Sequence, residues 1–220
     1  MIRLIRRQCR RALIEAGPAV IGAAALAAFA LLVRSQASGA PLGQTGSGAS
    51  ASAWPREGAP LVTALVACGP LAAARAGELA RMRLQHQLDA LRASGGSVSV
   101  HLVVPRLLAA AIALPLLVLV ADATGFGLTY LDWVPGAPGW ISADGVAPGD
   151  VAIGLARAAL FGLTLAGVAC IAGLTPPHGH RDGDRRRRAR SVGRATARAG
   201  AGGVVAVLGL HILLGGGWPW

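Results

Sequence analysis

The sequence predicts an all-α polytopic membrane protein, built from an N-terminal interfacial amphipathic helix and five transmembrane helices. Of the 220 residues, 54% are hydrophobic and only 14% are charged, whereas a soluble domain carries about 25% charged residues. The mean hydropathy is positive, at +0.55. The 21 basic residues are all arginine and gather between apolar runs. Basic clusters that alternate with apolar runs are typical of membrane topology signals.

Residues 1–17 are expected to form a basic helix that lies on the membrane surface. Five arginines alternate here with isoleucine and leucine, a pattern that suits a helix lying in the headgroup region. A signal-peptide n-region is the alternative, since an apolar run follows directly. The later apolar runs disfavour it, because a polytopic protein normally keeps its first span. Residues 18–220 are then one domain of five spans.

Five apolar runs are the candidate spans. The second contains Gly69-Pro70, which we expect to break it, and the third contains Pro115. A proline inside a membrane helix is tolerated when neighbouring groups satisfy the freed carbonyl. The runs cover residues 18–33, 60–76, 107–121, 151–173 and 199–217.

The distribution of arginine tests this division. With the N-terminus inside, the inner segments 1–17, 77–106 and 174–198 hold 5, 4 and 8 arginines. The outer loops 34–59 and 122–150 hold two and none. Five spans satisfy the positive-inside rule, whereas four or six would place a basic segment outside. We therefore expect a multi-pass protein of the plasma (inner) membrane with a cytoplasmic N-terminus.

The segment 77–106 is a polar stretch between the second and third spans. Leu84, Leu88 and Leu91 recur in it at helical spacing among charged and amide side chains, which predicts an amphipathic helix from Met82 to Leu91. Residues 94–97, Ser-Gly-Gly-Ser, should end that helix.

This segment resembles the loop between the second and third spans of the MlaE/YrbE permeases. The family reads A-E-I-G-x-M-x-x-T-E-Q-I-D-A-L, then M-G-V-D-P, then L-V-V-P-R. The chain departs from it at Ala80, His86 and Ser97-Val98. Two further stretches, 157–162 and 192–198, resemble family motifs as well. The matching residues of the segment are Glu78, Met82, Gln87, Asp89, Ala90, Leu91, Gly95 and 102–106.

The resemblance implies a permease subunit of an Mce-type ABC lipid transporter. Such a subunit moves hydrophobic lipids, works as a homo- or heterodimer with a homologous permease, and assembles with an ABC ATPase subunit and an Mce-domain lipid-binding protein. It implies that the loop helix couples the permease to the ATPase. The residues expected to make that contact are Met82, His86, Gln87, Asp89 and Leu91.

A second interpretation is a degenerate paralogue that serves as a structural or regulatory membrane subunit. Its basis is the set of departures at His86, Ser97-Val98 and Pro70, together with the short first span.

Three ionisable residues in or near the spans are further candidates, because a charge at membrane depth is costly and commonly functional. Glu78 either lies within the membrane or pairs at headgroup level. Arg157 either snorkels outward or lines a cavity. His211 replaces an aspartate common in the family, and a helix–helix hydrogen bond is favoured for it over a proton relay.

Other functions have little support. The run 185–190 could bind nucleic acid, but spans on both sides favour a topology signal that touches anionic lipid. His178, His180, Asp182 and Asp184 have donor types that suit a metal, yet they lack thiolates and lie in a proline-containing loop, so no metal is expected. The phosphate-binding pattern G-x-x-x-x-G-K-[ST] does not occur in the sequence. We expect no cofactor and no enzymatic activity in this chain, with ATP hydrolysis on a separate subunit.

Overall fold

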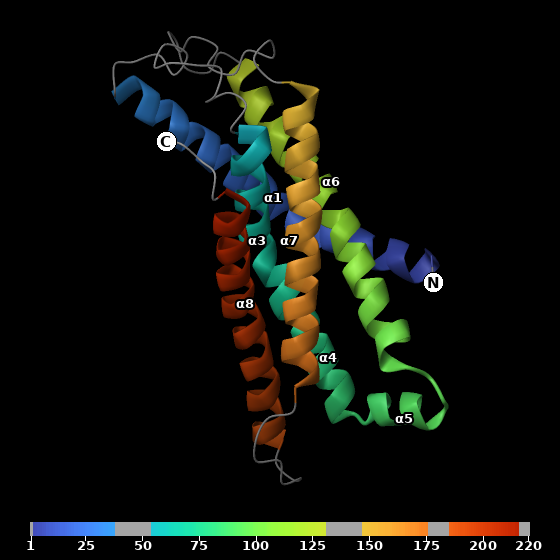
Figure 1. The fold of residues 1–220 in the computed structure, drawn as a ribbon. Coiled ribbons are helices and arrows are strands. Elements are labelled where there is room, and N and C mark those ends of the chain that lie inside the picture. The colour runs from blue at the N-terminus through green and yellow to red at the C-terminus, as the bar shows by residue number, and fades with distance from the viewer. Residues whose placement is uncertain (1, 38–53, 131–146, 176–184, 216–220) are drawn as a thin grey trace.

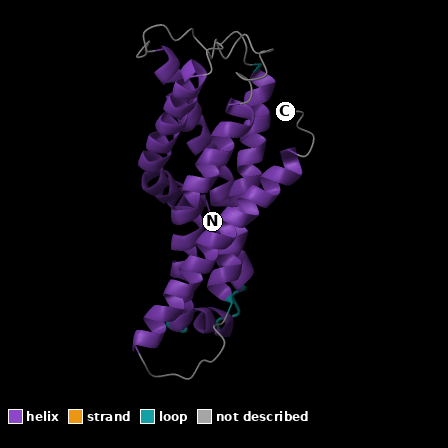
Figure 2. Ribbon diagram, turned by 90° about the vertical axis from the view of Figure 1, so that its left-hand side faces the viewer, coloured by secondary structure: helices purple, strands orange, loops and turns teal. Residues whose placement is uncertain are grey.

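The computed structural model describes residues 2–37, 54–130, 147–175 and 185–215. These residues form helices joined by short turns, without a strand among them (Figure 2). The prediction of an all-α protein is confirmed. In chain order the elements are α1 (Ile2–Ala37), η1 (Trp54–Gly58), α3 (Ala59–Ala67), η2 (Cys68–Ala73), α4 (Ala74–Leu84), α5 (Gln87–Ala93), η3 (Ser99–Val103), α6 (Val104–Tyr130), α7 (Pro148–Leu174) and α8 (Arg185–Gly215).

Four helical stretches are long and apolar enough to cross a membrane, within the part of the chain that the structure describes. They contain the second to fifth predicted runs, apart from residues 216–217, which lie outside the described residues. A multi-pass membrane protein is thereby confirmed. The four stretches are Trp54–Leu84, Ser99–Gly127, Pro148–Leu174 and Ala189–Gly215.

The first predicted run lies in α1, which continues through Pro18 as a single helix of 36 residues. The predicted surface helix and the predicted first span therefore belong to one element. Figure 1 shows α1 running obliquely across the other long helices. Its side chains from residue 28 onward lie outside the described set, and the crossing of the membrane by this first run stays a prediction.

The second span is continuous, and the predicted break at Gly69-Pro70 is wrong. These two residues lie in η2, a π-helical turn in which the Ala74 N–H bonds to the carbonyl of Gly69, five residues back. A proline removes one backbone donor and crowds the carbonyl four residues before it. The wider π turn accommodates both effects, so the helix continues into α4.

α7 packs against α6, α8, α4 and η1. Glycines allow its closest approaches. A Cβ on Gly173 would lie 2.6 Å from Leu79 Cβ and 2.9 Å from the Ala76 carbonyl oxygen of α4. Gly162 lies in the same way against the carbonyl of Ala110 on α6. Small residues at helix interfaces are typical of packing within membranes.

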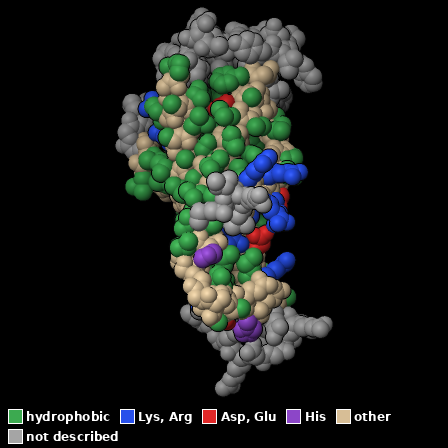
Figure 3. All heavy atoms as spheres, turned by 90° about the vertical axis from the view of Figure 1, so that its right-hand side faces the viewer, with side chains coloured by type: hydrophobic (Ala, Val, Ile, Leu, Met, Phe, Trp, Pro, Cys, Tyr) green, Lys and Arg blue, Asp and Glu red, His purple; other side chains and the backbone are tan. Residues whose placement is uncertain are grey.

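Large apolar side chains cover much of the outer surface. Figure 3 shows them over the upper part of one face, with arginine and acidic side chains gathered near mid-height. Contiguous apolar surface of this extent is rare on a soluble monomer but is expected where lipid surrounds the helices. Examples from α6, α7 and α8 are Ile112, Leu116, Leu119, Ile171, Val205, Ile212 and Leu213.

Candidate functional site at the α4–α5 turn

The predicted loop helix is two helices rather than one. α4 ends at Leu84, and α5 begins at Gln87 after a turn in which His86 has a φ of 56°. This left-handed conformation is uncommon for residues other than glycine, although histidine adopts it more readily than most. The turn redirects the chain, so that α5 lies at one end of the bundle (Figure 1). The prediction of one helix from Met82 to Leu91 is therefore wrong.

The leucine spacing does identify the packed side of α5. Leu88 is only 3% exposed, and Leu91 is half-buried. The chain turns after Ala93, as predicted: Gly95 has a φ of 79°, and a Cβ on Gly96 would lie 2.7 Å from Leu91 Cδ1. α5 is thus a short helix with one side packed and a tight turn at each end.

The opposite side of α5 is polar and open to solvent. Asp89 Oδ2 lies 3.2 Å from His86 Nδ1, and Asp89 Oδ1 accepts a hydrogen bond of 3.4 Å from Arg92 Nη1. Gln87 Nε2 donates to Gln85 Oε1 at 3.0 Å. Exposed pairs at this spacing contribute little to stability, so a partner protein can replace them at low cost. His86, Gln87 and Asp89 are therefore all accessible to a partner.

The other two predicted contact residues are placed differently. Met82 lies in α4, before the turn, and is half-buried. Leu91 points partly into the packed side of α5. Three of the five predicted residues are therefore exposed, and the other two are half-buried.

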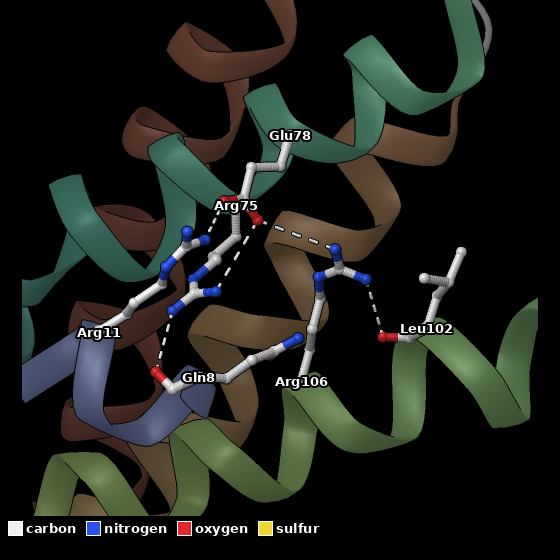
Figure 4. A network of polar contacts seen from close by, with 6 residues as sticks. All are labelled: Gln8, Arg11, Arg75, Glu78, Leu102 and Arg106. Atoms are coloured by element: carbon white, nitrogen blue, oxygen red, sulfur yellow. Dashed lines mark hydrogen bonds and ion pairs between the residues drawn. The ribbon is translucent and has the colours of Figure 1, made fainter. Parts of the chain in front are cut away.

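Glu78 of α4 is the centre of a charged cluster that joins three helices (Figure 4). Its carboxylate lies 3.6 Å from Arg11 Nη1 of α1, 3.8 Å from Arg75 Nη1 and 3.8 Å from Arg106 Nη2 of α6. Arg75 and Arg106 are buried, at 8% and 5% exposed. One further donor of each arginine reaches a backbone carbonyl, from Arg75 to Gln8 at 3.2 Å and from Arg106 to Leu102 at 3.0 Å. Glu78 is thus paired, while its position relative to the lipid headgroups stays a prediction.

A small cavity lies beside this cluster, with a volume of about 10 Å³. Gln8, Arg75 and Arg106 form its polar wall, and alanines of α6 and α7 form most of the rest. This volume suits about one water molecule, so the cavity cannot hold a lipid headgroup.

Arg83, which the sequence did not single out, connects α4 to the end of α7. Its Nη1 donates to the carbonyl of Gly173 at 3.3 Å and also to the carbonyl of Thr175. The last carbonyls of a helix lack partners within the helix, and a cation there is favoured by the helix dipole. Arg83 thus caps α7 just before the chain turns into α5.

Arg157 and His211 belong to a separate region nearer the other end of α7. Arg157 Nη1 lies 2.6 Å from Glu57 Oε1, and both side chains are largely buried, at 12% and 10% exposed. Arg157 also donates to the carbonyls of Arg56 and Leu214, so it binds η1 and α8 together within the bundle. The His211 ring lies against Phe161, with ring centroids 6.5 Å apart.

Sequence reasoning could not find the Glu78 partners as a group. Arg11 and Glu78 are 67 residues apart in the chain, and only the fold brings them together. The signal that was available was Arg106 itself, a charged residue at the start of a long apolar run. The predicted donors His178, His180, Asp182 and Asp184 lie outside the described residues. Within the described ranges, no group of three or more potential metal-ligating side chains occurs.

Comparison with known proteins agrees with this architecture. The sequence model of the family described as Permease MlaE matches residues 5–215. A probable ABC transporter permease protein of Rickettsia prowazekii (strain Madrid E) is 33% identical over 150 residues, covering 66% of this chain and 54% of that protein. The chloroplastic protein TRIGALACTOSYLDIACYLGLYCEROL 1 of Arabidopsis thaliana is 30% identical over 158 residues, covering 69% of this chain and 43% of that protein.

The chain thus spans about half the length of the curated relatives that it matches. The family match covers nearly all of the described helices, including the α4–α5 turn and the Glu78 cluster. The chain belongs to the MlaE permease family.

Proposed function

We propose that the chain is the membrane permease subunit of an ABC transporter that moves hydrophobic lipids, with ATP hydrolysis on a separate subunit. The observation that carries this proposal is the position of α5. It is the short polar helix between two membrane-spanning stretches, and it presents His86, Gln87 and Asp89 to solvent at one end of the bundle. The relatives named as ABC transporter permeases support the same function.

The contacts around α4 supply a mechanical route from this face into the spans. A force on α5 acts directly on α4, because only Gln85 and His86 separate them. From α4, Arg83 reaches the end of α7. Glu78 reaches α1 and α6 through Arg11 and Arg106. A displacement of α5 is therefore passed to three other helices through charged contacts.

Such coupling requires two conformations of the permease that differ in their affinity for the ATPase, since a partner that binds both equally shifts neither. We place α5 on the cytoplasmic side of the plasma membrane, where ATP is available. The arginine clusters at 1–17 and 174–198 support this orientation by the positive-inside rule. The proposed assembly adds a second permease copy or homologue and an Mce-domain lipid-binding protein. The substrate class is phospholipid, sterol or a related lipid.

The test is a double substitution, Gln87→Ala with Asp89→Ala, in the assembled transporter in lipid vesicles. Both side chains are exposed and make only weak local contacts, so the fold should persist. We expect ATP-driven lipid transfer to fall at least tenfold while the amount of protein in the membrane is unchanged. Arg190→Ala, an exposed residue of α8, is the matched control and should keep its transfer rate.

Lipid transfer at the unaltered rate in the double variant would refute the coupling role. Absence of ATP-driven transfer by the unaltered chain, despite binding of an ATPase, would instead favour the structural or regulatory subunit.

A further inference from the structure

Asp122 is a buried acid that the proposed coupling route does not use. It lies in α6 and is 5% exposed. Both carboxyl oxygens are sealed from solvent and have no hydrogen-bond partner among the described residues. Glu57, another buried acid of the bundle, does have a basic partner, because its carboxylate lies 2.6 Å from Arg157. Asp122 therefore lacks a positive charge like the one that Arg157 places beside the carboxylate of Glu57.

The surroundings of Asp122 are apolar or uncharged. Val118 and Ala121 are fully buried beside it on α6. One turn further along, Gly125 lies against the indole of Trp54, whose Nε1 is buried and also lacks a partner among the described side chains. These neighbours offer no positive charge to a carboxylate.

The elements packed against α6 carry few charges near this level. α3 has no titratable residue, and neither has α1 between residues 16 and 27. The Arg3 and Arg34 side chains, near the two ends of α1, lie outside the described set. Arg106 is on α6 itself, but 16 residues away, which is about 24 Å along the axis. Of the remaining titratable groups on the neighbouring elements, Glu57 and Arg157 pair with each other, and Arg56 is exposed. α7 also carries Asp150 at its start and Cys170 toward its other end, and η3 carries His101. The N-terminal half of α1 carries Arg6, Arg7, Cys9, Arg10, Arg11 and Glu15.

An ionised carboxylate in this position would be costly. A buried charge without a partner loses its hydration, and the group becomes neutral instead. A lipid headgroup or a second protein cannot neutralise Asp122 from outside, because neither oxygen is accessible on the surface. A proton can neutralise the buried carboxylate, because it takes up almost no volume and can arrive along a path no wider than a water molecule.

We propose that Asp122 is a proton-binding site within the membrane-spanning bundle. In this conformation it is a neutral carboxylic acid. It releases the proton only in a conformation that admits water between α6 and its neighbours.

This site links bundle opening to pH. The closed state holds one proton more than the open state, so raising the pH favours opening. For a single proton the closed-to-open ratio changes by at most about tenfold per pH unit. Asp122→Asn mimics the neutral acid permanently and should remove this dependence.

The test is infrared spectroscopy at pH 7 of the full chain in dodecyl maltoside, a detergent without carbonyl groups, with the spectrum of each variant subtracted from that of the unaltered protein. We expect the carbonyl band of a protonated carboxylic acid in the unaltered protein and its loss in Asp122→Asn. Asp89→Asn, which changes an exposed carboxylate, is the control and should leave the band in place. Identical bands in the unaltered protein and Asp122→Asn would overturn the proposal.

A spectrum of the unaltered protein alone is also decisive, should Asp122→Asn fail to fold. Absence of any protonated carboxyl band at pH 7 would overturn the proposal without a variant. The measurement needs neither an ATPase nor a transported lipid, so its outcome is independent of the proposed transport function.

Discussion

At the scale of single residues, three acids that pair with basic side chains lie in different settings. Asp89 is exposed and weakly paired, Glu78 is shared by three arginines, and Glu57 is buried against Arg157. These settings predict different costs of substitution. The exposed pair is screened by water, whereas the buried pair leaves an uncompensated charge when one partner is removed.

Glu57→Gln should therefore destabilise the protein by about 3 kcal/mol, because it leaves the Arg157 guanidinium buried without its counter-charge. Thermal unfolding in detergent measures this effect. Asp89→Gln is the matched control and should change the unfolding temperature little. The combined variant Glu57→Gln with Arg157→Met should be more stable than Glu57→Gln alone, and a combined variant that is less stable than the single one would contradict the account.

In the Glu78 cluster, the sequence predicts the central acid as a candidate but not its partners. Glu78 was a candidate because it is an acid next to an apolar run. Arg11 and Arg83 were not, because their partners lie on other helices that approach only in three dimensions. Spacing along the chain reports neighbours on one helix and does not report partners across the bundle.

At the scale of elements, the spans were predictable and their irregularities were not. Runs of apolar residues predict helices because the membrane requires every backbone hydrogen bond to be made within the segment. The π turn at Gly69-Pro70 keeps a helix continuous where the residue types predict a break. The left-handed His86 divides a helix where the leucine spacing predicts continuity. Both depend on local backbone geometry that the polar pattern does not encode.

The contact between α4 and α7 offers a test at this scale. Gly173→Val should prevent close packing, because its side chain would meet Leu79 and the Ala76 carbonyl at under 3 Å. Overpacking of this kind typically costs about 1–3 kcal/mol. Gly167→Val is the matched control on the same helix, since nothing lies within 4 Å of a Cβ there.

We expect a lower unfolding temperature for Gly173→Val and an unchanged one for Gly167→Val. Equal unfolding temperatures for the two variants would show that α4 and α7 do not pack through Gly173.

At the scale of the whole molecule, charge and apolar surface divide the bundle between two environments. The described end that carries α5 also carries the start of α8 (Figure 1), which begins with four arginines. Arg83 caps the end of α7 on the same side of the bundle. The remaining surface is largely apolar. This arrangement fits a permease that meets a soluble motor at one end and lipid along its sides, and the predicted arginine bias of the sequence agrees with it.

The sidedness of α5 tests this account most directly. A variant without Cys9, Cys68 and Cys170 that carries Arg92→Cys should react with a membrane-impermeant maleimide in inverted membrane vesicles and not in right-side-out vesicles. Gly149→Cys, at the opposite end of α7, should show the reverse pattern. Reaction of Arg92→Cys in right-side-out vesicles alone would place α5 outside the cell and contradict the proposed contact of α5 with a cytoplasmic ATPase.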